Sequence, residues 1–317
     1  MILVTGATGF VGSSIVEQLW TSGHDVRACS RQRSDSFPSA VDLITSGDLS
    51  ENNDWRHALQ DVDVVIHLAA RVHVMSESAG NPLAKFREVN AFATLNLARQ
   101  AAEAGVKRFI FISSIKVNGE LTEGEPFKPS DKFVPTDPYG LSKYEAEQGL
   151  LALAKETSME VVVIRPPLVY GPGVKANFAS MMEWVNKGVP LPLGAIHNQR
   201  SLVALDNLVN FIIHCIDHPK ATNEVFLISD GEDVSTTELL HKVAKVFGKR
   251  AFLLPVPVSW MVFAAKLVGK ADVANRLFGS LQVDSSKARE LLGWKPVITM
   301  DEQLKKTAEA YLNEKTV

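Results

Sequence analysis

The 317-residue chain has little of the residues that build several common kinds of functional site. It has only two cysteines, Cys29 and Cys215, in apolar surroundings and without the spacing of a metal site or a redox motif. We therefore expect no metal centre and interpret both cysteines as reduced core residues of a cytoplasmic protein. The net charge is −3, so no overall basic field favours nucleic acid as a partner.

Long hydrophobic runs are also scarce. The most apolar segment, residues 252–269, is interrupted by two prolines and Lys266, and it is shorter than the about 20 residues of a transmembrane helix. We therefore expect no transmembrane segment. A buried helix beginning near Ser259 is the favoured interpretation of this segment, and contact with a membrane surface is the alternative. The first strand pattern begins at Ile2, so we expect no signal peptide.

Short apolar runs alternate with amphipathic stretches over the first 165 residues. Apolar runs without polar alternation are typical of parallel strands buried on both faces. The pattern predicts an α/β fold with a doubly wound parallel sheet of the Rossmann type. The expected strands are 2–5, 26–30, 43–44, 62–68, 109–112 and 161–165, and the expected helices are 11–20, 55–59, 90–104 and 138–157.

The strand–helix rhythm ends after Arg165, where prolines become frequent. Residues 202–216 and 225–228 have the pattern of a return to the sheet, and the remainder mixes helix and loop. We predict a dinucleotide-binding domain of residues 1–165 and 200–228. A smaller C-terminal substrate-binding lobe, residues 166–199 and 229–317, would be interleaved with it in sequence.

A glycine-rich loop follows the first strand and opens the first helix. Its glycines at positions 6, 9 and 12 allow a tight turn and a close approach to a pyrophosphate, and the helix N-terminus adds N–H donors. The strand before the loop and the helix after it are the context that such a motif requires. We expect this loop to bind a dinucleotide through Gly6, Thr8, Gly9, Phe10 and Val11.

The end of the second expected strand bears on the choice between NAD and NADP. An acidic residue there would bind the ribose hydroxyls of NAD, but this chain has Ser30 and Arg31, which suit a 2′-phosphate. NADP(H) is therefore favoured over NAD(H), although Arg31 could instead stack on the adenine or face solvent. Asp48 is expected against the adenine amino group. The other expected cofactor contacts are Leu49, Leu68, Ala69, Ala70 and Pro166.

Tyr139 and Lys143 are four residues apart, which places both side chains on one face of a helix. Asp137 can cap this helix, and Pro138 suits its first turn. A nearby ammonium favours the phenolate and is expected to lower the tyrosine pKa from about 10, so that the phenol can exchange a proton with an alcohol or ketone. Ser114 ends the fifth expected strand and points to the same crevice as the glycine loop.

Taken together, these motifs resemble the extended short-chain dehydrogenase/reductase family, especially its nucleotide-sugar epimerases and reductases. The resemblance implies that Ser114, Tyr139 and Lys143 are the catalytic triad. Tyr139 would be the acid and base, Lys143 would hold the nicotinamide ribose, and both would contact the cofactor. The motifs are TGATGFVG (5–12), HLAA (67–70), FIFISS (109–114), YGLSK (139–143), RPPLVYGPG (165–173) and DSSKARELLGWKP (284–296).

The resemblance also implies a UDP-sugar substrate and often a homodimer. Asn177, with its neighbour Phe178, matches a position that contacts the substrate diphosphate. Arg200 matches an arginine that pairs with the same diphosphate, although a surface salt bridge is the alternative for it. Asn118 could contact a polar group of the sugar or only cap its loop.

The residues after Ser114 bear on the reaction. The family's 4,6-dehydratases have an Asp-Glu pair where this chain has Ile115 and Lys116, which argues against elimination chemistry. We favour an NADPH-dependent 4-ketoreductase acting on a UDP-4-keto-6-deoxy-HexNAc, a precursor of surface polysaccharide. The alternative is a 4-epimerase of UDP-glucose or UDP-GlcNAc with tightly bound NAD. A cofactor-binding regulator without turnover is a minor alternative.

Overall fold

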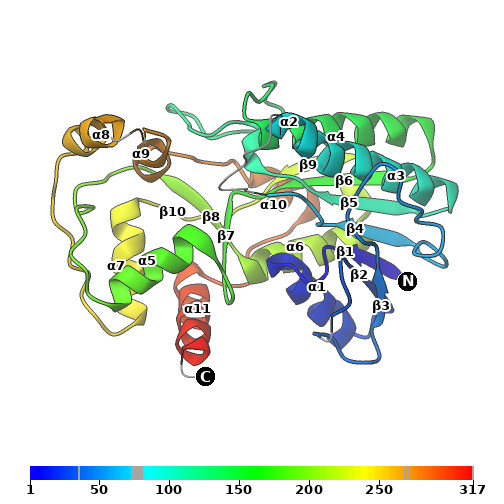
Figure 1. Cartoon of the computed structure of the whole chain (residues 1–317), viewed down its shortest axis with the longest axis horizontal. Helices are drawn as coiled ribbons and strands as arrows, with labels where there is room; N and C mark the ends of the chain where they lie inside the picture. Colours follow the sequence, from blue (N-terminus) through cyan, green and yellow to red (C-terminus); the bar gives the residue numbers. More distant parts are fainter. Residues whose placement is uncertain (35, 73–80, 268, 270, 316–317) are drawn as a thin grey trace.

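The computed structural model describes the chain except for residues 35, 73–80, 268, 270 and 316–317 (Figure 1). Its larger lobe is built on a seven-stranded parallel sheet with the order β3-β2-β1-β4-β5-β6-β9. This is the predicted doubly wound α/β arrangement, in which ligands bind at the carboxyl ends of the strands. The strands are β1 (Ile2–Thr5), β2 (Val26–Ser30), β3 (Asp42–Thr45), β4 (Val64–His67), β5 (Arg108–Ile112), β6 (Glu160–Arg165) and β9 (Glu224–Leu227).

Helices cover both faces of this sheet because its strands bury alternate residues on opposite sides. On β5, Ile110 joins one hydrophobic core, whereas Phe109 and Phe111 join the other. The first core includes residues of α1 (Phe10–Thr21), α6 (Leu205–Asp217) and α10 (Ser286–Leu292). The second includes residues of α3 (Ala93–Glu103) and α4 (Pro138–Glu156). The short α2 (Pro82–Arg87) leads into α3 through a π-helical turn, Glu88–Phe92, and a 3₁₀ turn, Ile115–Val117, follows β5.

The smaller lobe contains a three-stranded sheet with its own hydrophobic core. The strand β8 (Arg200–Ala204) pairs in parallel with β7 (Leu168–Tyr170) and antiparallel with β10 (Asp233–Val234). The chain returns to the larger sheet through α6, a 3₁₀ turn (Pro219–Ala221) and β9. The remaining helices, on the left and at the bottom of Figure 1, are α5 (Ala176–Asn186), α7 (Thr236–Val246), α8 (Val258–Leu267), α9 (Ala271–Phe278) and α11 (Met300–Glu314).

Two local predictions differ from the structure. Residues 55–59 form turns instead of a helix, with one helix-like bond from the Leu59 N–H to the Trp55 carbonyl, at 2.9 Å. The buried Trp55 contributes to the sheet core without a longer helix. The helix expected near Ser259 is present as α8, but none of its residues is buried. Within the described parts of the chain, no helix is long and apolar enough to cross a bilayer.

Candidate active site

The start of α4 has the predicted capping geometry and places Tyr139 and Lys143 at the end of β5. The Asp137 carboxylate accepts from the Gly140 N–H at 2.8 Å, and Pro138 is the first helical residue. Lys143, which is almost fully buried, donates from Nζ to the carbonyl of Ile112, the last residue of β5, at 2.8 Å. The Ser114 hydroxyl lies close enough to the Tyr139 phenol to lower its pKa. The structure therefore brings the three predicted catalytic side chains together at the carboxyl edge of the sheet.

The electrostatics of this triad differ from the prediction. Burial raises the pKa of Tyr139 to about 12; the Ser114 hydroxyl opposes this shift, and the charge of Asp137 adds to it. Burial lowers the pKa of Lys143 to about 7, opposed by the charge of Glu147. The expected lowering of the tyrosine pKa by Lys143 is wrong for this structure. The ammonium is committed to the Ile112 carbonyl and to the Phe111 ring, whose centre is 4.4 Å away.

A buried charge network beneath the triad was missed by the sequence analysis. Glu147 is fully buried one turn after Lys143 and accepts from Arg165 Nε at 2.9 Å and from the Ser113 hydroxyl. Arg165 Nη1 also donates to Asn118 Oδ1 at 2.9 Å. The network joins α4, β6 and the loop after β5 behind Lys143. The i, i+4 spacing of Lys143 and Glu147 was the signal that could have revealed it.

Two predicted substrate-binding residues are buried and make contacts within the protein. Asn118 donates from Nδ2 to the Lys128 carbonyl at 2.8 Å and accepts from Arg165, so both ends of its amide hold the loop. The alternative of a loop-holding role is therefore the one that the structure supports. Phe178 is 4% exposed and stacks on Tyr170 with ring centres 5.6 Å apart. It is a core residue of the smaller lobe, because the apolar face of α5 must be covered.

The other two substrate candidates lie on different elements of the smaller lobe. Asn177 is exposed in the first turn of α5. Arg200 begins β8 and is half-buried, with Nη1 donating to the Gly279 carbonyl at 3.0 Å, and burial lowers its pKa. This backbone contact holds the guanidinium at the lobe.

Lys116 connects the loop after Ser114 to the catalytic helix. Its ammonium lies 3.2 Å from the Asp137 carboxylate and 2.8 Å from that of Glu120, and its side chain is 17% exposed. A Cβ at Gly140 would lie 2.9 Å from the Lys116 carbonyl oxygen, so only glycine allows this approach. The residue that replaces a dehydratase carboxylate therefore neutralises the cap of α4.

The glycine-rich loop has the geometry of a diphosphate cradle. Gly6 has a φ of +69°, and a Cβ there would lie 2.8 Å from the Ala69 N. A Cβ at Gly12 would lie 2.2 Å from the Gly6 carbonyl oxygen. Within the described chain, no side chain caps α1 at Gly9, so the N–H groups of its first turn, including those of Phe10 and Val11, can face an anion. These residues fit the diphosphate of a dinucleotide.

The adenosine end of the expected cofactor site is less suited to a 2′-phosphate than the sequence indicated. The Ser30 hydroxyl donates to the Gln32 carbonyl at 2.6 Å. The Arg31 guanidinium lies 3.8 Å from the carboxylate of Asp48, and both side chains are exposed. A carboxylate beside Arg31 reduces the positive potential that a phosphate would need. Leu68, Ala69 and Ala70 follow β4 at the same edge of the sheet.

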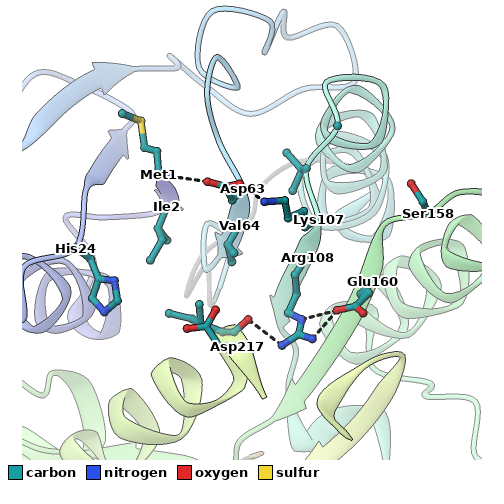
Figure 2. A pocket seen from close by; sticks show the side chains of 13 residues that line it. Met1, Ile2, His24, Asp63, Val64, Lys107, Arg108, Ser158, Glu160 and Asp217 are labelled. Atoms are coloured by element: carbon teal, nitrogen blue, oxygen red, sulfur yellow. Dashed lines mark hydrogen bonds and ion pairs between the residues drawn. The ribbon is translucent and has the colours of Figure 1, made fainter. Parts of the chain in front are cut away.

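A cavity of about 740 Å³ lies at the opposite edge, where β1, β4, β5 and β6 begin (Figure 2). Several of its charged groups are paired: Asp63 contacts the N-terminal ammonium at 2.8 Å and Lys107 at 2.7 Å. Arg108 pairs with Glu160 and donates to the last carbonyls of α6, including that of Ile216 at 2.8 Å. These contacts close the amino edge of the sheet. The cavity therefore lies away from the carboxyl edge of the sheet, where the triad is.

The seven-stranded parallel sheet and the glycine-rich loop define a class, the Rossmann-fold enzymes that bind a dinucleotide. Residues 2–229 match the NAD dependent epimerase/dehydratase family, and the chain belongs to this family. The UDP-glucose 4-epimerase of Vibrio cholerae is 53% identical over 314 residues, which cover 98% of this chain and 95% of that protein.

Solved structures share the fold over the whole chain. MoeE5 in complex with UDP-glucose and NAD has a TM-score of 0.79 at 25% identity, covering 100% of this chain and 99% of MoeE5. The UDP-glucose 4-epimerase of Thermotoga maritima, in complex with UDP-glucose, has a TM-score of 0.78 at 24% identity, with coverages of 100% and 99%. The second likeness shows the fold alone.

These comparisons correct two predictions. The favoured activity, NADPH-dependent reduction of a 4-keto sugar, is wrong, because the full-length relative at 53% identity is a 4-epimerase. The preference for NADP(H) is also wrong, because MoeE5 holds NAD. The physical reason lies at Arg31, whose charge faces Asp48 and is therefore not reserved for a phosphate. The prediction of an enzyme is confirmed, and these findings do not support the alternative of a cofactor-binding regulator without turnover.

Proposed function

We propose that this chain is a UDP-sugar 4-epimerase that retains NAD throughout its catalytic cycle. The observation that carries the proposal is the triad itself, with Ser114 close enough to Tyr139 to lower its pKa and Lys143 anchored to Ile112 at the carboxyl end of β5. The full-length similarity to a UDP-glucose 4-epimerase supports the same reaction. A UDP-glucose or UDP-GlcNAc type of sugar would bind with its C4 hydroxyl against Tyr139.

Each residue of the triad has a separate task. NAD held by the glycine loop would supply reversible hydride transfer at C4 of the sugar. The Tyr139 Oη would take the proton of the C4 hydroxyl and give it back, because one group can serve both directions of a reversible step. Ser114 Oγ would hold the same sugar oxygen and orient it. Lys143 would bind the nicotinamide ribose through its ammonium donors.

The remaining contacts follow from the two lobes. Gly6, Thr8 and Gly9 would hold the NAD diphosphate, and Asp48 would lie near the adenosine. Leu49, Leu68, Ala69, Ala70 and Pro166 are retained as proposed cofactor contacts. In the smaller lobe, Arg200 and Asn177 would bind the diphosphate of the UDP-sugar. We also retain the proposed division into residues 1–165 with 200–228 and 166–199 with 229–317, together with a homodimer in the cytoplasm.

Product analysis by NMR tests the reaction. Incubation with UDP-glucose or UDP-GlcNAc, without added reductant, is expected to give a mixture with the C4 epimer. Tyr139→Phe should lower kcat by about 10²–10⁴-fold while leaving NAD binding nearly unchanged. Tyr144→Phe, on the same helix, is the matched control and should keep its activity. The proposal fails if neither nucleotide sugar is epimerised or if Tyr139→Phe remains as active as Tyr144→Phe.

A further inference from the structure

The loop after β3 carries two of the proposed contacts to the adenosine end of NAD, Asp48 and Leu49. The strand β3 is the edge of the seven-stranded sheet, with β2 beside it, so the sheet supports this loop from one side. Leu49 packs against the core that contains Trp55, whereas Asp48 is exposed. The position of the Asp48 carboxylate therefore depends on what fixes the backbone of residues 46–53.

Asn53 closes this loop from within. Its Oδ1 accepts from the Ser50 N–H at 2.5 Å and from the Ser50 hydroxyl at 3.2 Å, and its Nδ2 donates to the Ser46 carbonyl at 3.1 Å. The Ser46 N–H donates in turn to the carbonyl of Ser30, the last residue of β2, at 3.0 Å. Both ends of the Asn53 amide are thus used to join the two ends of the segment that contains Asp48.

Two side-chain amides of α3 fasten the closed loop to the larger lobe. Asn96 Nδ2 and Gln100 Nε2 both donate to the Asn53 carbonyl, at 2.8 and 2.9 Å, which occupies both lone pairs of that oxygen. Gln100 Nε2 also donates to Asn96 Oδ1 at 3.0 Å, so the two amides fix each other. Gln100 Oε1 accepts from the N–H of the buried Trp55 at 2.8 Å. The loop is therefore held by a helix 43 to 47 residues away in sequence.

We propose that Asn53, Asn96 and Gln100 are positioning residues that hold the Asp48 carboxylate against the adenine amino group of NAD. This inference rests on the proposed function, in which the chain retains NAD. A carboxylate accepts hydrogen bonds and cannot donate them, so a fixed Asp48 selects a base that offers an amino group at this point. A loop that is ordered before the cofactor arrives also avoids the entropy cost of ordering on binding, which increases affinity.

Competition between NAD and nicotinamide hypoxanthine dinucleotide tests the proposal. In this analogue an oxygen acceptor replaces the adenine amino group. The purified chain is equilibrated with an equal mixture of the two, and the bound dinucleotides are then analysed. We expect the unmodified chain to favour NAD by about fivefold or more, because a hydrogen bond to a charged group is lost with the analogue. Asn96→Ala combined with Gln100→Ala should reduce this preference towards the value for Asp48→Ala.

A second variant and a control accompany the double variant. Gln100→Glu keeps the acceptor for the Trp55 N–H and removes one donor to Asn53, so it should lower the preference by a smaller factor. Arg99→Gln, at an exposed residue of the same helix, is the matched control and should keep the preference of the unmodified chain. Unaltered circular dichroism would show that the variants remain folded.

Two results would overturn the proposal. The first is an unmodified chain that binds the two dinucleotides equally. The second is a double variant that keeps the full preference for NAD while Asp48→Ala loses it, because a merely structural role would weaken both dinucleotides by the same factor. The measurement needs no epimerisation, so a chain that fails to epimerise UDP-sugars can still show or lack the preference.

Discussion

Replacing Glu147 by glutamine should destabilise the chain by about 3–5 kcal/mol, because it leaves the Arg165 guanidinium buried without its anion. The side chains of Glu147 and Arg165 are 0% and 7% exposed, so water cannot replace the lost charge. The same helix offers a matched control in Glu145, whose salt bridge with Arg87 is 29% and 38% exposed. A pair exposed to that extent contributes about 0–1 kcal/mol. Burial is therefore the main difference between the two substitutions.

Urea denaturation of the two variants measures this difference. Glu147→Gln should also lower the pKa of Lys143 below its value of about 7, since the charge of Glu147 raises that pKa. The alkaline limb of kcat/KM that depends on protonated Lys143 should then move to lower pH, and the Glu145→Gln profile should not. Equal unfolding free energies for the two variants, together with unshifted pH profiles, would refute the role assigned to the buried network.

Three further outcomes are expected. Lys116→Met should raise the pKa of Tyr139 further, because the charge of Asp137 loses its counterion, and should move the limb of the pH–rate profile set by the phenolate to higher pH. Lys116→Arg should leave this limb unchanged, and equal profiles for the two variants would contradict the prediction. Burial lowers the pKa of His67 to about 3. The free energy of unfolding should therefore fall by about 1.4 kcal/mol per pH unit as the pH drops from about 6.5 towards 3. His67→Gln should reduce this slope, measured by denaturation at a series of acidic pH values. Gly12→Ala should abolish NAD retention, measured in the purified protein, because its Cβ would meet the Gly6 carbonyl; retained NAD would refute the close approach.

Features set by local rules were predictable from the sequence. The Asp137 cap and Pro138 fix the start of α4, and the period of the helix then places Tyr139 and Lys143 together. Gly6, after β1, has a φ of +69°, a left-handed conformation that residues with a Cβ rarely adopt. Glycine at this position therefore marks the turn. These signals depend on neighbours in sequence, and the sheet follows from uninterrupted apolar runs.

Features set by tertiary partners were not predictable in this way. Asn118 has the composition of a substrate contact, but its amide is used by Arg165 and Lys128, 47 and 10 residues away. Arg31 suits a phosphate until Asp48, from the next strand's loop, lies beside it. Burial likewise raises the pKa of Tyr139, although the sequence spacing favoured the opposite direction. In each case the outcome depends on groups distant in sequence that the fold places around the side chain.

The apolar segment of α8 is another feature that the sequence did not predict correctly, because its side chains are exposed and not buried. Its composition predicts burial, yet Trp260 is 71% exposed, because the smaller lobe already has a core built from α5, α7 and α11. The sequence shows that a segment is hydrophobic, but it does not show whether the core of its lobe is already complete without that segment.

The most direct test of the central claim is the cofactor balance during turnover. The purified chain, with its bound NAD and with no free cofactor added, should epimerise many equivalents of UDP-glucose or UDP-GlcNAc per enzyme while the amount of NAD stays constant. Conversion that stops without added NADPH, or that consumes one NADPH per sugar, would contradict the account and indicate a reductase.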